Sequence, residues 1–274
     1  MQTATYDPAV ARAFFMSAGT PADIAEGKKI FGEKERAIPL LRAQKVYLLL
    51  KGEVGLVNRK QPIARVRPGE IFGEMALISG APRSASAIAN TACRVIELDA
   101  KQFETALARK PEFAVMLMSV MIHRLRETIA QLKDQNAFSK DEEWHEAAAI
   151  RPAHLAELVS GIADDTPSHF GEGARILAEG QKGLRMYAVL EGRVRISIAG
   201  RVVERLGPGG VFGEIALVDP SEKRVADAVA DTDASLLPIT RDAFLTLVKM
   251  SPRFAHTILV SLAERLRFLT ARLG

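Results

Sequence analysis

Two short stretches of the chain contain the residue types best suited to binding chemistry, and they share one pattern. The first is FGEMALISGAPRSASA, from Phe72 to Ala87, and the second is FGEIALVDPSEKRVADA, from Phe212 to Ala228. In each, a glycine lets the backbone approach a ligand closely. A glutamate can accept hydrogen bonds from sugar hydroxyls, and an arginine can make paired, charge-assisted bonds to a phosphate. The pattern predicts a cradle for a sugar phosphate, built twice.

The candidate ligand-binding residues are the ones that share this motif. In the first cradle they are Phe72, Gly73, Glu74, Met75, Ala76, Arg83, Ser84 and Ala85. In the second cradle they are Phe212, Gly213, Glu214, Ile215, Ala216, Arg224, Val225 and Ala226. A glutamate and an arginine this close in sequence are usually surface charges or a structural ion pair. The repetition of the whole pattern is what favours a binding site.

The repeat extends well beyond the cradles. Glu214 lies 140 positions after Glu74, and the same offset relates VYLLLKGEVGLV at 46–57 to MYAVLEGRVRIS at 186–197. Phe103 and Phe244 are 141 apart, so the second cradle loop has one extra residue between Glu214 and Arg224. We therefore expect two domains, at 1–137 and 153–274, joined by a linker at 138–152.

Each repeat is predicted to be mainly β with flanking helices. Period-two alternation and β-branched runs separated by glycines indicate many short strands, with turns at Lys51-Gly52 and Glu191-Gly192. Such a succession is typical of a jelly-roll-like barrel, or β-roll, rather than a parallel sheet. One long C-terminal helix follows each β-roll, from Phe113 and from Phe254 onward.

The second long helix has leucines at heptad spacing. This leucine seam comprises Ala255, Leu259, Leu262, Leu266, Leu269 and Leu273, and the matching first-repeat positions are Met118, Met121, Leu125, Thr128 and Leu132. Two interpretations are open. The helices pack only on their own β-rolls, or the seam makes a helix–helix or subunit contact, with a homodimer as the expected assembly.

Composition excludes several other functions. The only cysteine, Cys93, rules out a disulfide within the chain and a thiolate metal cluster, and the five histidines show no metal-ligand spacing. No catalytic constellation stands out, so we expect neither an enzyme nor a cofactor. The net charge of +4 is spread among mixed charges, so we do not expect DNA as a partner. Without a signal peptide or a charge-free apolar segment of spanning length, the chain is expected to be cytoplasmic and not in a membrane.

Both repeats resemble the cyclic nucleotide-binding domains of the bacterial catabolite activator protein and of the regulatory subunits of cAMP-dependent protein kinase. The resemblance rests on the family pattern F-G-E-apolar-A-L followed by P-R and small residues, matched from Phe72 to Ala85. It implies an eight-stranded β-roll and a cyclic nucleotide ligand, cAMP or cGMP. It also implies that Glu74 holds the ribose 2′-hydroxyl, and that Arg83 with the Ser84 and Ala85 amides holds the cyclic phosphate.

The same resemblance assigns a residue of the first long helix to the adenine. Thr128, in HRLRET, matches the adenine-contacting threonine of the activator, and Ile129 replaces the adjacent serine. The competing interpretation is an ordinary helix threonine whose hydroxyl bonds to its own backbone.

The second repeat departs from the family pattern in four places. Lys223 stands where the first repeat has Pro82, Val225 replaces the hydroxyl residue, Leu269 replaces Thr128, and Asp227 adds a negative charge near the expected phosphate. Because Glu214 and Arg224 remain, we expect a competent second site with a lower affinity for cAMP.

The output is expected to lie in an unidentified protein effector. The activator family carries a helix-turn-helix after its long helix, whereas here the acidic segment KDQNAFSKDEEWHEAAAI and the second β-roll follow. No Arg-Arg dipeptide occurs, so the substrate mimic of the kinase regulatory subunits is not expected. The leading hypothesis is a sensor whose long helices rearrange when nucleotide binds. The alternatives are a transcription-associated regulator that contacts DNA without a winged helix, and a scaffold with one or both sites inactive.

Overall fold

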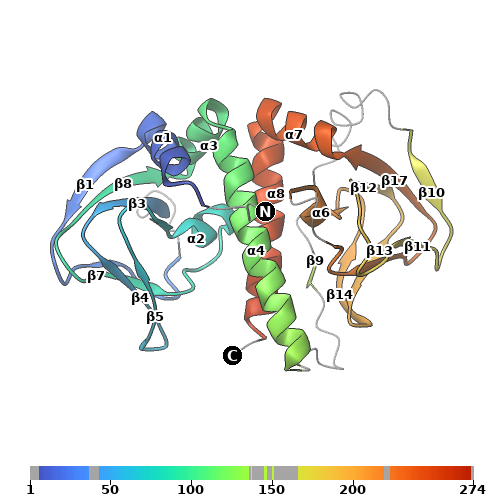
Figure 1. Ribbon diagram of the computed structural model, residues 1–274, viewed down its shortest axis with the longest axis horizontal. Coiled ribbons are helices and arrows are strands. Elements are labelled where there is room, and N and C mark those ends of the chain that lie inside the picture. Colours follow the sequence, from blue (N-terminus) through green and yellow to red (C-terminus); the bar gives the residue numbers. More distant parts are fainter. Residues whose placement is uncertain are drawn as a thin grey trace. The chain divides into compact units, whose positions relative to one another are not determined.

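A computed structural model of the chain describes residues 6–36, 43–135, 137, 145–146, 150, 166–218 and 223–272. It contains two β-rolls, each made of paired antiparallel sheets with helices on the flanks (Figure 1). Mainly β structure with flanking helices, and a long helix after each β-roll, were predicted from the sequence and are confirmed. No helix within these ranges has the length and apolar character needed to cross a bilayer.

The first β-roll uses the first eight strands. Its sheets have the strand orders β1-β8-β3-β6 and β2-β7-β4-β5. Its elements are α1 (Pro8–Ala18), β1 (Thr20–Ile24), β2 (Lys29–Phe31), β3 (Lys45–Lys51), β4 (Val54–Asn58), β5 (Gln61–Val66), β6 (Ile71–Phe72), α2 (Glu74–Ser79), β7 (Ser86–Ala89), β8 (Cys93–Asp99) and α3 (Ala100–Arg109).

The second β-roll repeats this topology. Its sheets have the orders β10-β17-β12-β15 and β11-β16-β13-β14-β9, and β9 (His145–Glu146) adds to the edge strand β14 in parallel. Its other elements are β10 (Ser168–Phe170), β11 (Arg175–Leu177), β12 (Arg185–Glu191), β13 (Val194–Ile198), β14 (Arg201–Leu206), β15 (Val211–Phe212), α6 (Ile215–Val218), β16 (Asp227–Ala230), β17 (Ala234–Thr240) and α7 (Arg241–Met250).

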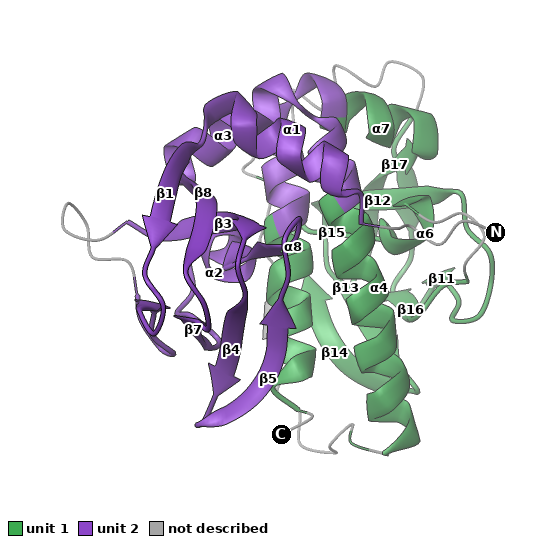
Figure 2. Cartoon of the chain, turned by 60° about the vertical axis from the view of Figure 1, so that its left-hand side comes forward, with its two compact units in different colours: residues 1–5, 117–248, 260–274 green, residues 6–116, 249–259 purple. Residues whose placement is uncertain are grey.

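The long helices are α4 (Glu112–Asp134) and α8 (Pro252–Thr270). The chain divides into two compact units, with boundaries inside α4, α7 and α8 (Figure 2). One unit holds the first β-roll with residues 6–116, and also residues 249–259 from the end of α7 and the first part of α8. The other holds residues 117–248 and 260–274, so most of α4 belongs to the unit of the second β-roll. The repeat boundaries at 137 and 153 stay a prediction about the sequence.

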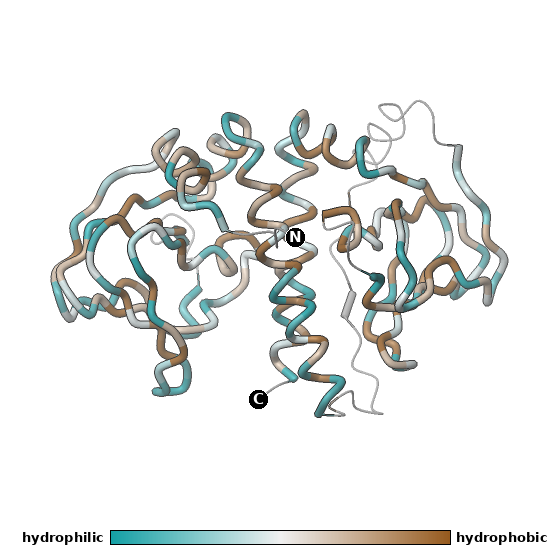
Figure 3. Tube along the Cα trace, in the orientation of Figure 1, coloured by the Kyte–Doolittle hydropathy of each residue, from teal (hydrophilic) through white to brown (hydrophobic). Residues whose placement is uncertain are grey.

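Apolar strand faces form the core of each β-roll. In the first, Phe31, Tyr47 and Phe72 pack together in the interior, with Tyr47 and Phe72 stacked at a centroid distance of 5.0 Å. In the second, Tyr187 and Phe212 stack at 5.5 Å. Figure 3 shows the resulting alternation of apolar and polar stretches along the trace, with the β4–β5 turn hydrophilic. The predicted turns after β3 and β12 are confirmed, because Gly52 and Gly192 both have positive φ.

Most members of the leucine seam are buried. Leu259, Leu262, Leu266 and Leu269 are at most 7% exposed, and Met118, Met121, Leu125 and Leu132 of α4 are at most 2% exposed. Leu273 lies outside the described residues. Apolar burial of this extent contributes strongly to stability, so the seam is part of the folded core of a single chain.

Candidate functional site

Each cradle begins at a glycine that no other residue could replace without strain. Gly73 precedes α2 with φ 81°, and Gly213 precedes α6 with φ 86°. A Cβ at Gly73 would lie 2.8 Å from Arg83 Nη1, and one at Gly213 would lie 2.9 Å from Arg224 Nη1. The sequence predicted that these glycines admit a ligand. In the structure they provide the left-handed turn and the room for the arginine of the same cradle.

The arginine of the first cradle is fixed by the backbone. Arg83 is 5% exposed; its Nη1 donates to Gly73 O at 2.7 Å and its Nη2 donates to Lys45 O at 2.7 Å. Its guanidinium carbon lies 4.1 Å from the centroid of the Phe31 ring, a favourable cation–π position. The loop that carries Arg83 is also fixed by a backbone hydrogen bond, because Arg83 N donates to Glu35 O at 2.9 Å.

The second cradle reproduces this arrangement. Arg224 is 7% exposed; its Nη1 donates to Gly213 O at 2.6 Å and its Nη2 donates to Arg185 O at 2.5 Å. Its backbone N donates to Gln181 O at 2.8 Å, as Arg83 N does to Glu35 O. The two arginines therefore have equivalent backbone partners. Residues 219–222 of the second loop lie outside the described ranges.

Both guanidinium groups have one buried donor left over. Arg83 Nε and Arg224 Nε have no hydrogen-bond partner in the described part of the chain. Burial lowers the pKa of Arg83, with Tyr47, Glu35 and Glu74 opposing the shift, and burial lowers the pKa of Arg224 as well. A buried donor without an acceptor is costly. An anion that accepts from Nε would remove the cost and also stabilise the positive charge.

The glutamates of the cradles are buried at the start of the short helices. Glu74 is 8% exposed and Glu214 is 1% exposed. Glu214 Oε1 accepts from Arg265 Nη1 of α8 at 2.7 Å, whereas Glu214 Oε2 is buried without a hydrogen-bond partner among the described residues. This free carboxylate oxygen is an acceptor for a hydroxyl or an amine of a ligand.

The second cradle opens into a pocket. All eight residues predicted for this site line it: Phe212, Gly213, Glu214, Ile215, Ala216, Arg224, Val225 and Ala226. The two long helices supply the rest of an apolar wall. Leu125 and Ile129 come from α4, and Phe268 and Leu269 come from α8. The residues that line the pocket therefore combine a buried cation, a carboxylate with one unpaired oxygen, and an apolar wall.

The other predicted residues have mixed settings. Phe72 is 1% exposed and belongs to the core, while Met75 is half-buried and Ala76 and Ala85 are buried. Ser84 is exposed. Thr128 is buried on α4, and its hydroxyl donates to Arg124 O at 2.9 Å. That bond is the one expected of an ordinary helix threonine, so the adenine contact of Thr128 stays a prediction.

Asp227 has a partner other than the ligand. Its Oδ1 accepts from Glu179 N at 3.0 Å, and Glu179 forms an ion pair with Lys133 of α4. Asp227 does line the pocket, but part of its acceptor capacity is used on the backbone. The repulsion that the sequence suggested between Asp227 and a phosphate is therefore reduced.

Sequence reasoning missed three contributors to the second site: Arg265, Glu204 and the α4 side chains. An Arg-Leu-Arg triplet in both long helices, at Arg124 and Arg265, was a usable signal. Glu204 gave a weaker signal, because it is not repeated: the first repeat has Ala64 at the corresponding position. Nothing in the sequence indicated that α4 of the first repeat lines the second pocket, since matching one repeat to the other reveals no contact between them.

Comparison with known proteins identifies the family. The model of the cyclic nucleotide-binding domain matches residues 41–110 and again residues 167–251. The cyclic AMP receptor protein of Thermus thermophilus is 39% identical over 103 residues, which are 36% of this chain and 47% of that protein. The cAMP-dependent protein kinase regulatory subunit of Aspergillus niger is 30% identical over 200 residues, which are 72% of this chain and 42% of that protein.

A structural neighbour is the regulatory domain of Toxoplasma gondii PKA in co-crystals with cAMP. It has 21% sequence identity and a TM-score of 0.32, over 88% of this chain and 92% of that chain. The chain spans about half or less of the two curated relatives named above. The two family matches together cover more than half of the chain. The chain thus belongs to the cyclic nucleotide-binding domain family and carries two such domains in tandem.

Proposed function

We propose that the chain is a cyclic nucleotide sensor, with cAMP as its ligand and cGMP as the alternative, that signals to a protein effector. The observation that carries the proposal is the unsatisfied polar chemistry of the second pocket. There, Arg224 and Glu214 both line the pocket, and Arg224 Nε and Glu214 Oε2 have no hydrogen-bond partner among the described residues. A cyclic nucleotide offers a phosphate oxygen to the donor and a ribose hydroxyl to the acceptor.

The apolar wall of the pocket suits the remaining part of such a ligand. Leu125, Ile129, Phe268 and Leu269 provide the hydrophobic surface that a base would cover. The names of the relatives point to the same ligand, since one is a cyclic AMP receptor protein and another a cAMP-dependent kinase regulatory subunit. In the first cradle, Arg83 offers the same free Nε to a phosphate.

Signalling would follow from the place of the long helices. Because α4 and α8 both line the second pocket, a ligand that fills it contacts both helices. A ligand that binds one arrangement of these helices better shifts the population toward that arrangement. The effector is proposed to read this change. The kinase regulatory subunit among the relatives supports a kinase as one such partner. A cytoplasmic location is part of the same proposal.

The assembly of the chain is also part of the proposal. The leucine seam is buried within one chain, which supports packing of the long helices within the chain rather than the homodimer that we expected from the sequence.

DNA binding without a winged helix and a scaffold with inactive sites are the competing functions. The first predicts binding to duplex DNA that weakens steeply with salt, and the second predicts no nucleotide binding.

Titration calorimetry of the full chain with cAMP, and separately with cGMP, tests the proposal. We expect a saturable isotherm for the wild type and its loss when Arg83→Ala and Arg224→Ala are combined. Removing one charged hydrogen bond costs about 1.5–3 kcal/mol, roughly ten- to 150-fold in affinity. Arg201→Ala, at an exposed arginine of β14, is the matched control and should bind like the wild type. Absence of heat with both nucleotides would refute the sensor.

A further inference from the structure

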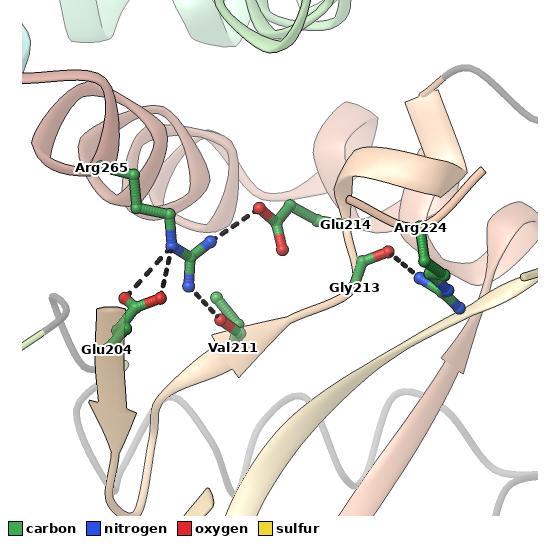
Figure 4. Close-up of polar contacts among 6 residues, drawn as sticks. All are labelled: Glu204, Val211, Gly213, Glu214, Arg224 and Arg265. Carbon is green, nitrogen blue, oxygen red and sulfur yellow. Dashed lines mark hydrogen bonds and ion pairs between the residues drawn. The ribbon is translucent and has the colours of Figure 1, made fainter. Parts of the chain in front are cut away.

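The guanidinium of Arg265 forms hydrogen bonds to two buried carboxylates, Glu204 and Glu214 (Figure 4). Arg265 Nε donates to both oxygens of Glu204, at 3.1 and 3.0 Å, and Nη1 donates to Glu214 Oε1 at 2.7 Å. Arg265 Nη2 donates to Val211 O at 2.6 Å. Each nitrogen of the guanidinium thus has a partner, and the partners come from three different segments. Arg265, Glu204 and Glu214 are at most 9% exposed.

The cluster has two carboxyl groups and one guanidinium. Burial raises the pKa of Glu204, and Arg265 only partly opposes the shift. The two carboxylates together raise the pKa of Arg265, so the guanidinium stays charged. Burying a second carboxylate against one guanidinium has a high desolvation cost, and replacing buried ionic groups by apolar ones is often neutral or stabilising. Stability alone does not account for Glu204.

The first repeat lacks this second carboxylate. Alignment at the 140-residue offset places Ala64 opposite Glu204, while Glu74 corresponds to Glu214. Glu204 also lines the second pocket together with Glu214 and Arg265. Of the two repeats, the second alone has this glutamate. Glu204 contacts Arg265, and Arg265 in turn contacts Glu214, the candidate residue for ribose binding.

Glu204 limits how Arg265 can bind Glu214. Arginine and a carboxylate tend to pair through two parallel hydrogen bonds, which would use both oxygens of Glu214. Here Glu204 holds the Nε edge and the Val211 carbonyl holds Nη2, so only Nη1 reaches Glu214. Glu214 Oε2 is left buried and without a hydrogen-bond partner in the described part of the chain.

We propose that Glu204 is a positioning residue of the second site, which holds Arg265 so that one oxygen of Glu214 stays open to a sugar hydroxyl of the ligand. The proposal rests on the function proposed above. Without Glu204, the guanidinium is free to turn toward Glu214 and to engage both of its oxygens. The sugar hydroxyl would then have to compete with Arg265 for its acceptor. Glu204 itself need not contact the ligand.

The test compares cAMP with its 2′-deoxy analogue, because only the former has the hydroxyl in question. Binding is measured by calorimetry in the full chain carrying Arg83→Ala, so that the second site is the one observed. With Glu204 present we expect cAMP to bind about tenfold tighter than the analogue, the effect of one hydrogen bond to a charged group. With Glu204→Ala we expect cAMP to lose most of that advantage while the affinity for the analogue is nearly unchanged.

Two further variants make the result specific. Glu204→Gln keeps the shape of the side chain, should the alanine variant fail to fold, and we expect it to reduce the preference for cAMP as well. Glu264→Gln removes another negative charge that acts on Glu204, and it should leave the preference intact.

Two outcomes would overturn the inference, and they are distinguishable. If folded Glu204→Ala and Glu204→Gln proteins still prefer cAMP about tenfold, the positioning role is wrong although the second site binds nucleotide. If the Arg83→Ala protein binds neither nucleotide, the proposed function of the second site fails and this inference fails with it.

Discussion

At the scale of single residues, the two cradles agree in their arginines and differ around them. Arg83 and Arg224 have equivalent backbone acceptors and the same free Nε. The differences that remain are the exposed Lys223 in place of Pro82, Val225 in place of Ser84, and the pocket-lining Leu269 in place of Thr128. Proline limits the conformations of the unbound loop, so less entropy is lost when its arginine is fixed.

These differences predict unequal affinities for cAMP, with the first site the tighter. A deficit of a single hydrogen bond, about 1 kcal/mol, corresponds to roughly a fivefold difference in Kd. Calorimetry at one salt concentration on Arg224→Ala, which keeps the first site, and on Arg83→Ala, which keeps the second, measures it. Lys223 adds positive charge beside Arg224 and acts in the opposite direction. Equal affinities would show that the local differences cancel.

His256 predicts how stability depends on pH. Burial lowers its pKa below the ordinary value of 6.5, and Glu104 of α3 opposes the shift. Because the folded-state pKa is the lower one, the folded chain favours the neutral imidazole. The contribution to stability is therefore present above the unfolded-state pKa and is lost as the pH falls through the folded-state pKa.

Thermal unfolding of the wild type and of His256→Gln across pH 5–8 checks the sign. The glutamine cannot titrate, so we expect the Tm of the wild type to fall relative to the variant as the pH drops below about 6.5. Glu104→Gln should enlarge this fall in Tm, because it removes the negative charge that stabilises the protonated His256 in the folded chain. A constant Tm difference at all pH values would contradict the assignment to His256.

At the scale of elements, helix α4 is the part of the second site that the first repeat supplies. Leu125 and Ile129 line the pocket, and Arg126 Nη1 donates to Lys223 O at 3.0 Å. Lys223 directly precedes Arg224, so α4 is bonded to the loop that positions the phosphate-binding candidate. The same helix pairs Lys133 with Glu179.

This bond predicts that Arg126→Ala weakens the second site without touching the ligand. Loss of one anchor gives the loop more freedom, and we expect cAMP affinity in the Arg83→Ala background to fall by about fivefold, the effect of roughly 1 kcal/mol. Glu127→Ala, at an exposed position on the same helix, is the control. If both variants bind as the Arg83→Ala protein does, α4 does not support the loop.

The elements also show where sequence reasoning reached its limit. The cradles were predictable because each is a local pattern, glycine to arginine within about a dozen residues, and because it occurs twice. The strand turns were predictable because Gly52 and Gly192 are required by backbone geometry. The contributions of α4, Arg265 and Glu204 were not. They arise from contacts between segments that are distant in sequence, and a match between repeats carries no information about such contacts.

At the scale of the whole molecule, the leucine seam relates folding to assembly. Leu266 is 7% exposed in a single chain, and its seam neighbours are more deeply buried. A homodimer formed through this face would have to expose these side chains first, at a cost of about 1.5–3 kcal/mol for each. The burial therefore favours a monomer in which the seam stabilises the fold.

The last prediction tests whether the leucine seam stabilises the fold of one chain or forms a subunit interface. Leu266→Asp places an unpaired carboxylate in an apolar setting, which we expect to lower the free energy of unfolding by about 3 kcal/mol or more. Thr270→Asp adds the same group at an exposed position of α8 and should change it by about 0.5 kcal/mol. Light scattering should give a monomer for the wild type and for both variants. A wild-type dimer that Leu266→Asp dissociates, with little change in the stability of the monomer, would instead assign the seam to the subunit interface.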